Sequence, residues 1–136
     1  MPDELQNNLS LYRLNKSARD LHDAKINLDA GSYDTATNRA YYSTFHAMRS
    51  VLALDKKDYS KHSAVISFFQ KDYIRTGIFD RCHGRTIKLA GALRISSDYD
   101  DYVDASKEDA IEAIQLASEF HEAVKTYIQR RISSEP

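Results

Sequence analysis

The residue types best suited to chemistry lie together on one predicted helix, which begins near residue 32 or 34 and ends near residue 54. Most of its positions are apolar, and one polar stripe interrupts them, made of Arg39, Ser43, His46 and Ser50. Arg39 and His46 are seven residues apart, which is about 700° of rotation and roughly 10 Å along the axis, so they project from one side. An arginine and a histidine on a mostly buried helix must find polar partners or line a cleft.

This pair suits the cleavage of a phosphodiester. A histidine titrates near neutral pH and can take the proton of a ribose 2′-hydroxyl, and an arginine can neutralise the charge that develops around phosphorus. Arg39 and His46 are therefore the candidate catalytic residues. Three neighbours on the same helix are candidate substrate-binding residues: Tyr42, Ser43 and Arg49.

A structural role is the alternative for the same two residues. Arg39 can form an ion pair with Asp34 or Asp98, and His46 can form a hydrogen bond with a backbone carbonyl. An arginine and a histidine at this spacing occur often by chance, so the spacing by itself favours the structural role.

Three further residues are candidates for binding substrate. Lys61 and His62 stand where another helix is predicted to begin, a place that binds anions readily but that is equally an ordinary cap region. Arg94 lies four residues before Asp98 and either pairs with that acid across one helical turn or faces the cleft. A structural clamp on the acidic segment that follows is the simpler role for Arg94.

Charge is unevenly distributed along the chain. Residues 71–97 contain six bases and two acids, a local charge of +4, whereas residues 98–136 contain ten acids and four bases, a charge of −6. A basic stretch of this size can hold phosphates. Two solvated faces, or two surfaces that complement each other in a dimer, account for the asymmetry more simply.

The sequence predicts neither a metal site nor a cofactor site. Cys82 and His83 are adjacent rather than spaced as metal ligands, and His22, His83 and His121 fall on different predicted helices. No glycine-rich phosphate loop is present, which excludes P-loop and dinucleotide-binding folds.

The elements that carry these residues are all predicted to be helices. The only prolines are Pro2 and Pro136, and four glycines are few for the turns that a sheet protein needs. Apolar periodicity predicts helices over about residues 14–28, 34–54, 60–74, 79–96 and 107–128, the first of them ended by Gly31. The predicted fold class is all-α, an antiparallel bundle of about five helices.

The first and last helices have recognisable patterns. The first carries an apolar stripe of Leu14, Ala18, Leu21, Ala24 and Leu28. Ser106 and Asp109 form a predicted capping box before the last helix. The stripe of the last helix contains Ala110, Ile114, Ala117, His121, Val124 and Ile128.

Size and composition predict one domain over residues 1–136. The chain has a mass of 15.5 kDa, a formal net charge of −1 and a single cysteine. One cysteine allows no intrachain disulfide and fits a reducing cytoplasm. The N-terminus does not have the pattern of a secretory signal, and no apolar run approaches the ~18 residues of a membrane span.

Part of this sequence resembles a known family. Residues 31–47 (GSYDTATNRAYYSTFHA) resemble the signature helix of small stand-alone HEPN proteins, a name that stands for higher eukaryotes and prokaryotes nucleotide-binding. Two more landmarks follow in the family's order: residues 61–63 (KHS) before Phe68 and Phe69, and the element Arg94-x3-Asp98-Tyr99. The resemblance extends over about residues 14–128.

The resemblance implies a helical bundle, usually homodimeric, whose two protomers form a composite cleft. Many family members are toxins or defence effectors that cut RNA without a metal through an Arg-x(4–6)-His motif, which Arg39-x6-His46 matches at its widest spacing. Nuclease members usually carry the motif on a later helix, whereas here it lies on the second. Other members are catalytically silent and bind nucleotides or proteins, and many are encoded beside a minimal nucleotidyltransferase that acts as the antitoxin.

Two functions follow from the residues and the resemblance together. The first is a metal-independent endoribonuclease of a toxin–antitoxin or defence system, with His46 as general acid or base and Arg39 holding the phosphate. The second is a non-catalytic module that binds a nucleotide, or a minimal nucleotidyltransferase, through the same stripe. For both functions we expect a cytoplasmic homodimer in a prokaryote.

Overall fold

The computed structural model describes residues 3–99 and 104–134, which form helices connected by short loops. In chain order the elements are α1 (Asp3–Asp29), α2 (Tyr33–Leu54), α3 (His62–Phe69), the π-helical turn η1 (Gln70–Ile74), α4 (Arg81–Tyr99) and α5 (Lys107–Ser133). These ranges contain no strand. The predicted all-α helical bundle is therefore confirmed.

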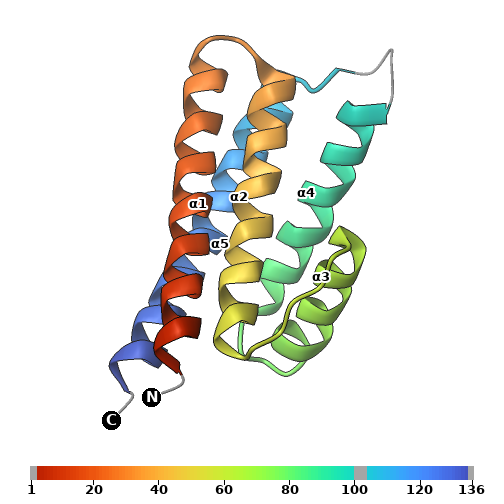
Figure 1. Cartoon of the computed structure of the whole chain (residues 1–136). Coiled ribbons are helices and arrows are strands. Elements are labelled where there is room, and N and C mark those ends of the chain that lie inside the picture. The colour runs from red at the N-terminus through yellow and green to blue at the C-terminus, as the bar shows by residue number, and fades with distance from the viewer. Residues whose placement is uncertain (1–2, 100–103, 135–136) are drawn as a thin grey trace.

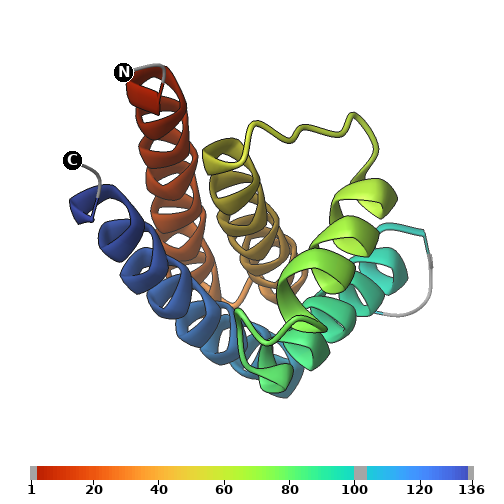
Figure 2. The same ribbon diagram turned by 90° about the horizontal axis from the view of Figure 1, so that it is seen from below.

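The bundle is built around α2. α1 and α2 form an antiparallel hairpin with the largest interface of the fold, and the turn between them places Gly31 at a φ of 79°, where glycine is favoured. α5 packs against both helices of the hairpin, and α3 and α4 also contact α2 (Figure 1). Seen from below, α3 lies on the opposite side of α2 from α1 (Figure 2). α2, whose positions are mostly apolar, therefore lies in the middle of the bundle.

The main core lies where α2, α3, η1 and α5 meet. Phe69, which ends α3, has no exposed surface, and its ring contacts those of Tyr73, Phe79 and Phe120 at centroid distances of 5.0, 5.6 and 5.7 Å. Aromatic side chains bury more apolar area than other residues and dominate the energetics of a core. No helix in the described ranges combines the length and the apolar character needed to cross a membrane.

The start of α5 is as predicted. Ser106 Oγ accepts a hydrogen bond from the backbone N–H of Asp109 at 3.0 Å, and the Asp109 carboxylate accepts one from the N–H of Ser106 at 3.2 Å. This capping box satisfies two backbone donors that a helix terminus would otherwise leave without a partner. The predicted stripe of α5 is buried at every position, including His121.

Several expectations about the helices are wrong in part. α1 begins at Asp3, eleven residues before its predicted start, and α5 ends at Ser133, five residues after its predicted end. Ala18 is exposed, because α1 turns the side containing Ser10, Arg13 and Ser17 toward the bundle instead. The helix predicted over residues 60–74 does end at residue 74, but its last turn is the π-helical η1. α4 continues to residue 99, three residues beyond its predicted end. A π-helical turn contains one residue more than an α-helical turn. This difference changes the spacing of apolar residues too little to be recognised from the sequence.

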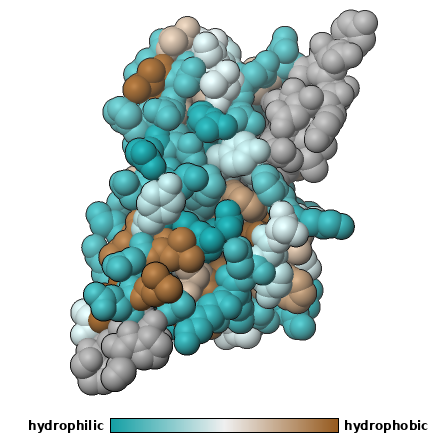
Figure 3. Space-filling model, viewed as in Figure 1, coloured by the Kyte–Doolittle hydropathy of each residue, from teal (hydrophilic) through white to brown (hydrophobic). Residues whose placement is uncertain are grey.

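The outer side of α1 exposes an apolar patch. Leu5, Leu9 and Tyr12 are 73%, 41% and 56% exposed. Figure 3 shows apolar surface gathered in the lower part of the molecule, near the start of α1, on a face that is otherwise largely polar. These residues are three or four positions apart, so they share one side of the helix, and continuing that spacing leads to Lys16.

Candidate functional site

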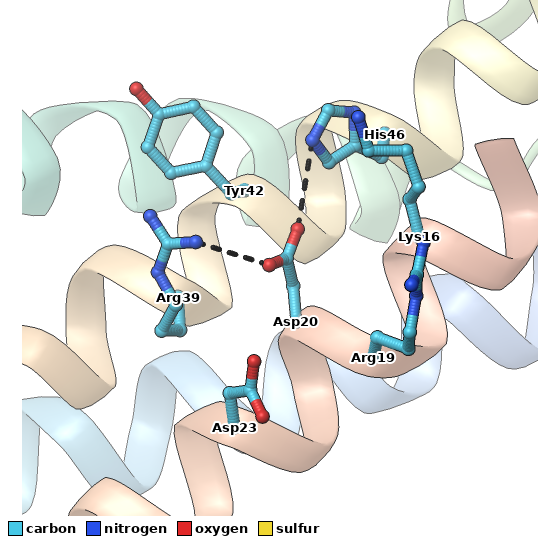
Figure 4. A pocket seen from close by; sticks show the side chains of 7 residues that line it. All are labelled: Lys16, Arg19, Asp20, Asp23, Arg39, Tyr42 and His46. Atoms are coloured by element: carbon cyan, nitrogen blue, oxygen red, sulfur yellow. Dashed lines mark hydrogen bonds and ion pairs between the residues drawn. The ribbon is translucent and has the colours of Figure 1, made fainter.

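A pocket of about 390 Å³ opens between α1 and α2. α2 contributes the predicted catalytic pair and one predicted substrate-binding residue to its wall, and α1 contributes four charged side chains (Figure 4). The lining residues are Lys16, Arg19, Asp20, Asp23, Arg39, Tyr42 and His46.

The carboxylate of Asp20 joins the two members of the predicted catalytic pair. Asp20 Oδ1 accepts a hydrogen bond from Arg39 Nη1 at 3.2 Å, and Asp20 Oδ2 lies 3.6 Å from His46 Nε2. In Figure 4 the carboxyl group of Asp20 stands between the two α2 side chains. Two residues too far apart on α2 to touch each other therefore converge on one group supplied by α1.

Arg39 is held in place from more than one direction. Besides Asp20, its guanidinium donates to Asn38 Oδ1 through Nη2 at 2.8 Å and through Nε at 3.3 Å. Its central carbon lies 4.9 Å from the centre of the Tyr42 ring, a cation–π distance. The side chain is 35% exposed, so N–H groups of the guanidinium remain accessible to a ligand in the pocket.

His46 is held largely out of water. Its side chain is 14% exposed, and burial, together with the nearby cations Lys16 and Arg49, lowers the pKa of His46 to about 4. The imidazole is therefore uncharged at neutral pH, and its 3.6 Å approach to Asp20 is a contact rather than a full ion pair. Nδ1 is buried without a hydrogen-bond partner among the described residues, so Nε2 is the ring nitrogen that faces the pocket.

Comparisons with known proteins show the family to which this chain belongs. The family model of the HEPN domain matches residues 10–127, which include every residue that lines the pocket. The chain belongs to the HEPN family. The resemblance inferred from residues 31–47 is confirmed.

The relatives come from bacteria and archaea. A UPF0332 protein of Thermotoga maritima is 28% identical over 109 residues, 80% of this chain and 83% of its own length. A protein of Methanocaldococcus jannaschii whose name gives it as a candidate toxin is 30% identical over 126 residues, 92% of this chain and 86% of its own. A UPF0332 protein of Archaeoglobus fulgidus is 28% identical over 128 residues, 94% of this chain and 98% of its own. The HEPN family thus includes toxin-type relatives that align along most of this chain.

Ser43, also predicted to bind substrate, does not face the pocket of this HEPN domain. It is completely buried, and its carbonyl and hydroxyl oxygens lie 2.7 and 3.1 Å from Ser17 Oγ. Ser17 Oγ in turn lies 2.8 Å from His121 Nδ1. Ser43 therefore belongs to a buried polar network that connects α1, α2 and α5.

The other predicted substrate-binding residues also lie outside the pocket lining. Arg49 forms an ion pair with Asp58 at 3.0 Å. Lys61 is the exposed N-cap of α3, and His62 begins that helix with its ring 4.1 Å from the ring of Phe45. Arg94 is on α4, but its side chain lies outside the described residues, as does that of Asp98.

Four pocket residues were not predicted, and all of them are on α1. Lys16, Arg19, Asp20 and Asp23 share one side of that helix, but alternating charges on a helix also describe an ordinary solvated face. The suggested partner of Arg39, Asp34, instead accepts a hydrogen bond from the backbone N–H of Ala105 at 2.6 Å. Within the described ranges, no three His, Cys, Asp or Glu side chains are grouped so that they could hold a metal ion.

The low pKa of His46 makes the stability of the domain depend on pH. The pKa is about 4 in the folded state and 6.5 for an ordinary histidine in the unfolded chain, so between these pH values the unfolded chain binds an additional proton. The free energy of unfolding should therefore fall as the pH drops from 6.5 toward 4, by about 2 kcal/mol at pH 5. Urea unfolding of the wild type and His46→Asn at pH 7 and pH 5 measures this contribution, which an equal pH dependence in both proteins would refute.

Proposed function

We propose that this HEPN protein is a toxin-type, metal-independent endoribonuclease that uses the pocket between α1 and α2. The observation that carries the proposal is the convergence of Arg39 and His46 on one side of the same pocket, around the shared carboxylate of Asp20. On the α1 wall, Lys16 and Arg19 place two positive charges beside the carboxylates of Asp20 and Asp23. The printed name of the Methanocaldococcus jannaschii relative supports the toxin class.

The chemistry assigns one role to each residue. Arg39, oriented by Asp20 and Asn38, binds a phosphate oxygen and neutralises charge as it develops in the transition state. His46, uncharged at neutral pH, accepts the proton of the ribose 2′-hydroxyl at Nε2 while that oxygen attacks phosphorus. The 5′-oxygen leaves and receives a proton from the imidazolium. The products are a cyclic 2′,3′-phosphate and a free 5′-hydroxyl.

Cleavage of mixed RNA in EDTA tests this proposal. We expect the wild type to cut RNA with EDTA present and the Arg39→Ala/His46→Ala double variant to lose at least about 10²-fold of the rate. Arg130→Ala/His22→Ala replaces the same two residue types at exposed positions away from the pocket and is the matched control. No cleavage by the folded wild type, or equal cleavage by both variants, would refute the proposal.

A specific observation favours a second candidate, a nucleotide-binding module without catalysis. Asp20 already engages both Arg39 and His46, while the Arg39 guanidinium over the Tyr42 ring offers a surface for a phosphate and a base. A ligand that binds only the folded state stabilises it by RT ln(1 + [L]/Kd). A nucleotide that raises the melting temperature of the wild type but not of Arg39→Ala, without RNA cleavage, would select this function.

We also propose a homodimer, with a minimal nucleotidyltransferase as the antitoxin partner in the cytoplasm. The exposed patch of Leu5, Leu9 and Tyr12 supports a second copy as its occupant, because it lies on the side of α1 that continues to Lys16. A dimer formed there would extend the pocket across two protomers. Large exposed apolar patches on soluble proteins commonly mark interaction sites.

A further inference from the structure

A second hollow, on another part of the molecule, is lined only by basic charges. It measures about 410 Å³ and lies between η1, the segment after it and α4. Arg75, Arg81, Arg85 and Lys88 contribute four positive charges, and no carboxylate lines it. Gln70 and Ile74 from η1 are part of its wall.

Its charge separates this hollow from the other pockets. The candidate site mixes three bases with two carboxylates, and the hollows beside the α1–α2 turn and beside the start of α4 also include acids. A hollow between α1 and α5 has no acid either, but Lys125 is its only lysine or arginine. The two acids closest in sequence to the basic hollow have other partners: Asp72 pairs with Lys57 at 3.3 Å, and Asp80 accepts a hydrogen bond from the backbone N–H of Cys82 at 2.9 Å. None of the four basic side chains forms a hydrogen bond or a close ion pair within the described part of the chain, although the charge of Arg81 does interact with that of Asp80.

The fold brings the four bases together through close packing of η1 on α4. Arg81, Arg85 and Lys88 are spaced by four and three residues, so they form one row along α4, about 6 and 4.5 Å apart along the axis. Gly84 lies within this row, and a Cβ there would come within 2.9 Å of Gln70 Oε1 and 3.1 Å of Ile74 Cγ2. Because glycine has no Cβ, Gln70 can approach closely enough for its Nε2 to donate a hydrogen bond to the carbonyl of Gly84 at 3.0 Å. Arg75, directly after η1, is thereby held opposite the row.

We propose that this basic hollow binds the phosphate backbone of single-stranded RNA, away from the pocket between α1 and α2. Three of its four bases are arginines, whose planar forks bind phosphate oxygens through two N–H groups at once. All four side chains are exposed, so binding requires no internal ion pair to be broken. The choice of RNA among polyanions rests on the proposed ribonuclease function.

An uncleavable RNA separates binding from cleavage. The probe is a fluorescent 12-nucleotide 2′-O-methyl RNA, which lacks the attacking hydroxyl, and its affinity is measured by anisotropy from 50 to 200 mM salt. Each phosphate contact contributes a slope of about 0.7 to the dependence of log K on log salt for single strands. We expect Arg81→Gln/Arg85→Gln to bind roughly tenfold more weakly and to lower that slope by about 1.4. Lys25→Gln/Lys107→Gln removes the same charge from exposed positions elsewhere and should bind as the wild type does.

The binding measurement distinguishes failure of the basic hollow as the RNA site from failure of the proposed nuclease. Unchanged affinity in Arg81→Gln/Arg85→Gln, or an equal loss in the lysine control, would overturn the basic hollow as the RNA site, even if the wild type cleaves ordinary RNA. Displacement of the probe by poly-glutamate at matched charge would assign the hollow to an acidic protein and overturn the choice of RNA. A tenfold loss in a protein that cleaves no RNA would uphold the hollow and remove only the proposed nuclease.

Discussion

Asp20→Asn is expected to reduce kcat for RNA cleavage by about 10²-fold, with a smaller effect on KM and an unchanged melting temperature. Asn keeps the shape of the side chain but has a single acceptor oxygen, so it cannot hold Arg39 and contact His46 in the same way. The pair would lose its common partner, and misplacement of reacting groups by about 1 Å is enough to cost a factor of this size. Asp20 is therefore a positioning residue in the proposed mechanism.

The pocket supplies its own control for this prediction. Asp23 lines the same pocket one turn further along α1, but its carboxylate has no hydrogen bond or ion pair among the described residues. Asp23→Asn removes an equal charge and should change kcat by less than Asp20→Asn does. If Asp20→Asn instead cleaves as fast as the wild type or faster, the carboxylate competes with the substrate phosphate for Arg39 and does not position the pair.

Phe69→Ala should lower the free energy of unfolding by about 3–5 kcal/mol. The side chain has no exposed surface and contacts three aromatic rings, so alanine leaves a cavity that rigid neighbours from η1 and α5 cannot fill. A loss of this size is a large fraction of the ~5–15 kcal/mol that stabilises a typical domain. Urea unfolding monitored by circular dichroism measures it.

The adjacent residue is a matched control for that measurement. Phe68 has the same side chain but is 38% exposed, and it stacks on Tyr59 at a centroid distance of 4.5 Å. Phe68→Ala removes surface contacts rather than core, so it should cost much less than Phe69→Ala. Equal losses for the two variants would show that the main core does not depend on Phe69 as described.

Local sequence patterns predicted a helix well where the pattern is compatible with only one structure. The capping box at Ser106 and the apolar stripe of α5 specify one helix start and one buried face. α1 was harder, because the side that it buries includes Ser10, Arg13 and Ser17, which hydrophobicity alone assigns to solvent. Their burial depends on polar partners supplied by other helices, such as Ser43 and His121 for Ser17.

Only the part of the candidate site that lies on a single helix, α2, could be predicted from the sequence. Helical geometry places Arg39 and His46 on one side of α2, and both line the pocket. Ser43 lies within the same stripe, but it turns into the bundle, since the position of α1 decides which edge of the stripe is covered. The contact of Asp20 with both residues depends on the register between α1 and α2, which the sequence of neither helix specifies.

The α1–α2 hairpin contains every side chain of the Arg39–Asp20–His46 cluster, so the cluster consists of contacts between residues at most 26 positions apart. Sub-global unfolding proceeds in cooperative units that often coincide with such supersecondary motifs. Opening of the segment from α3 to α4 would break the aromatic core but none of the contacts within the cluster. Chain topology thus separates the local stability of the proposed catalytic groups from that of the basic hollow, which depends on η1 remaining packed on α4.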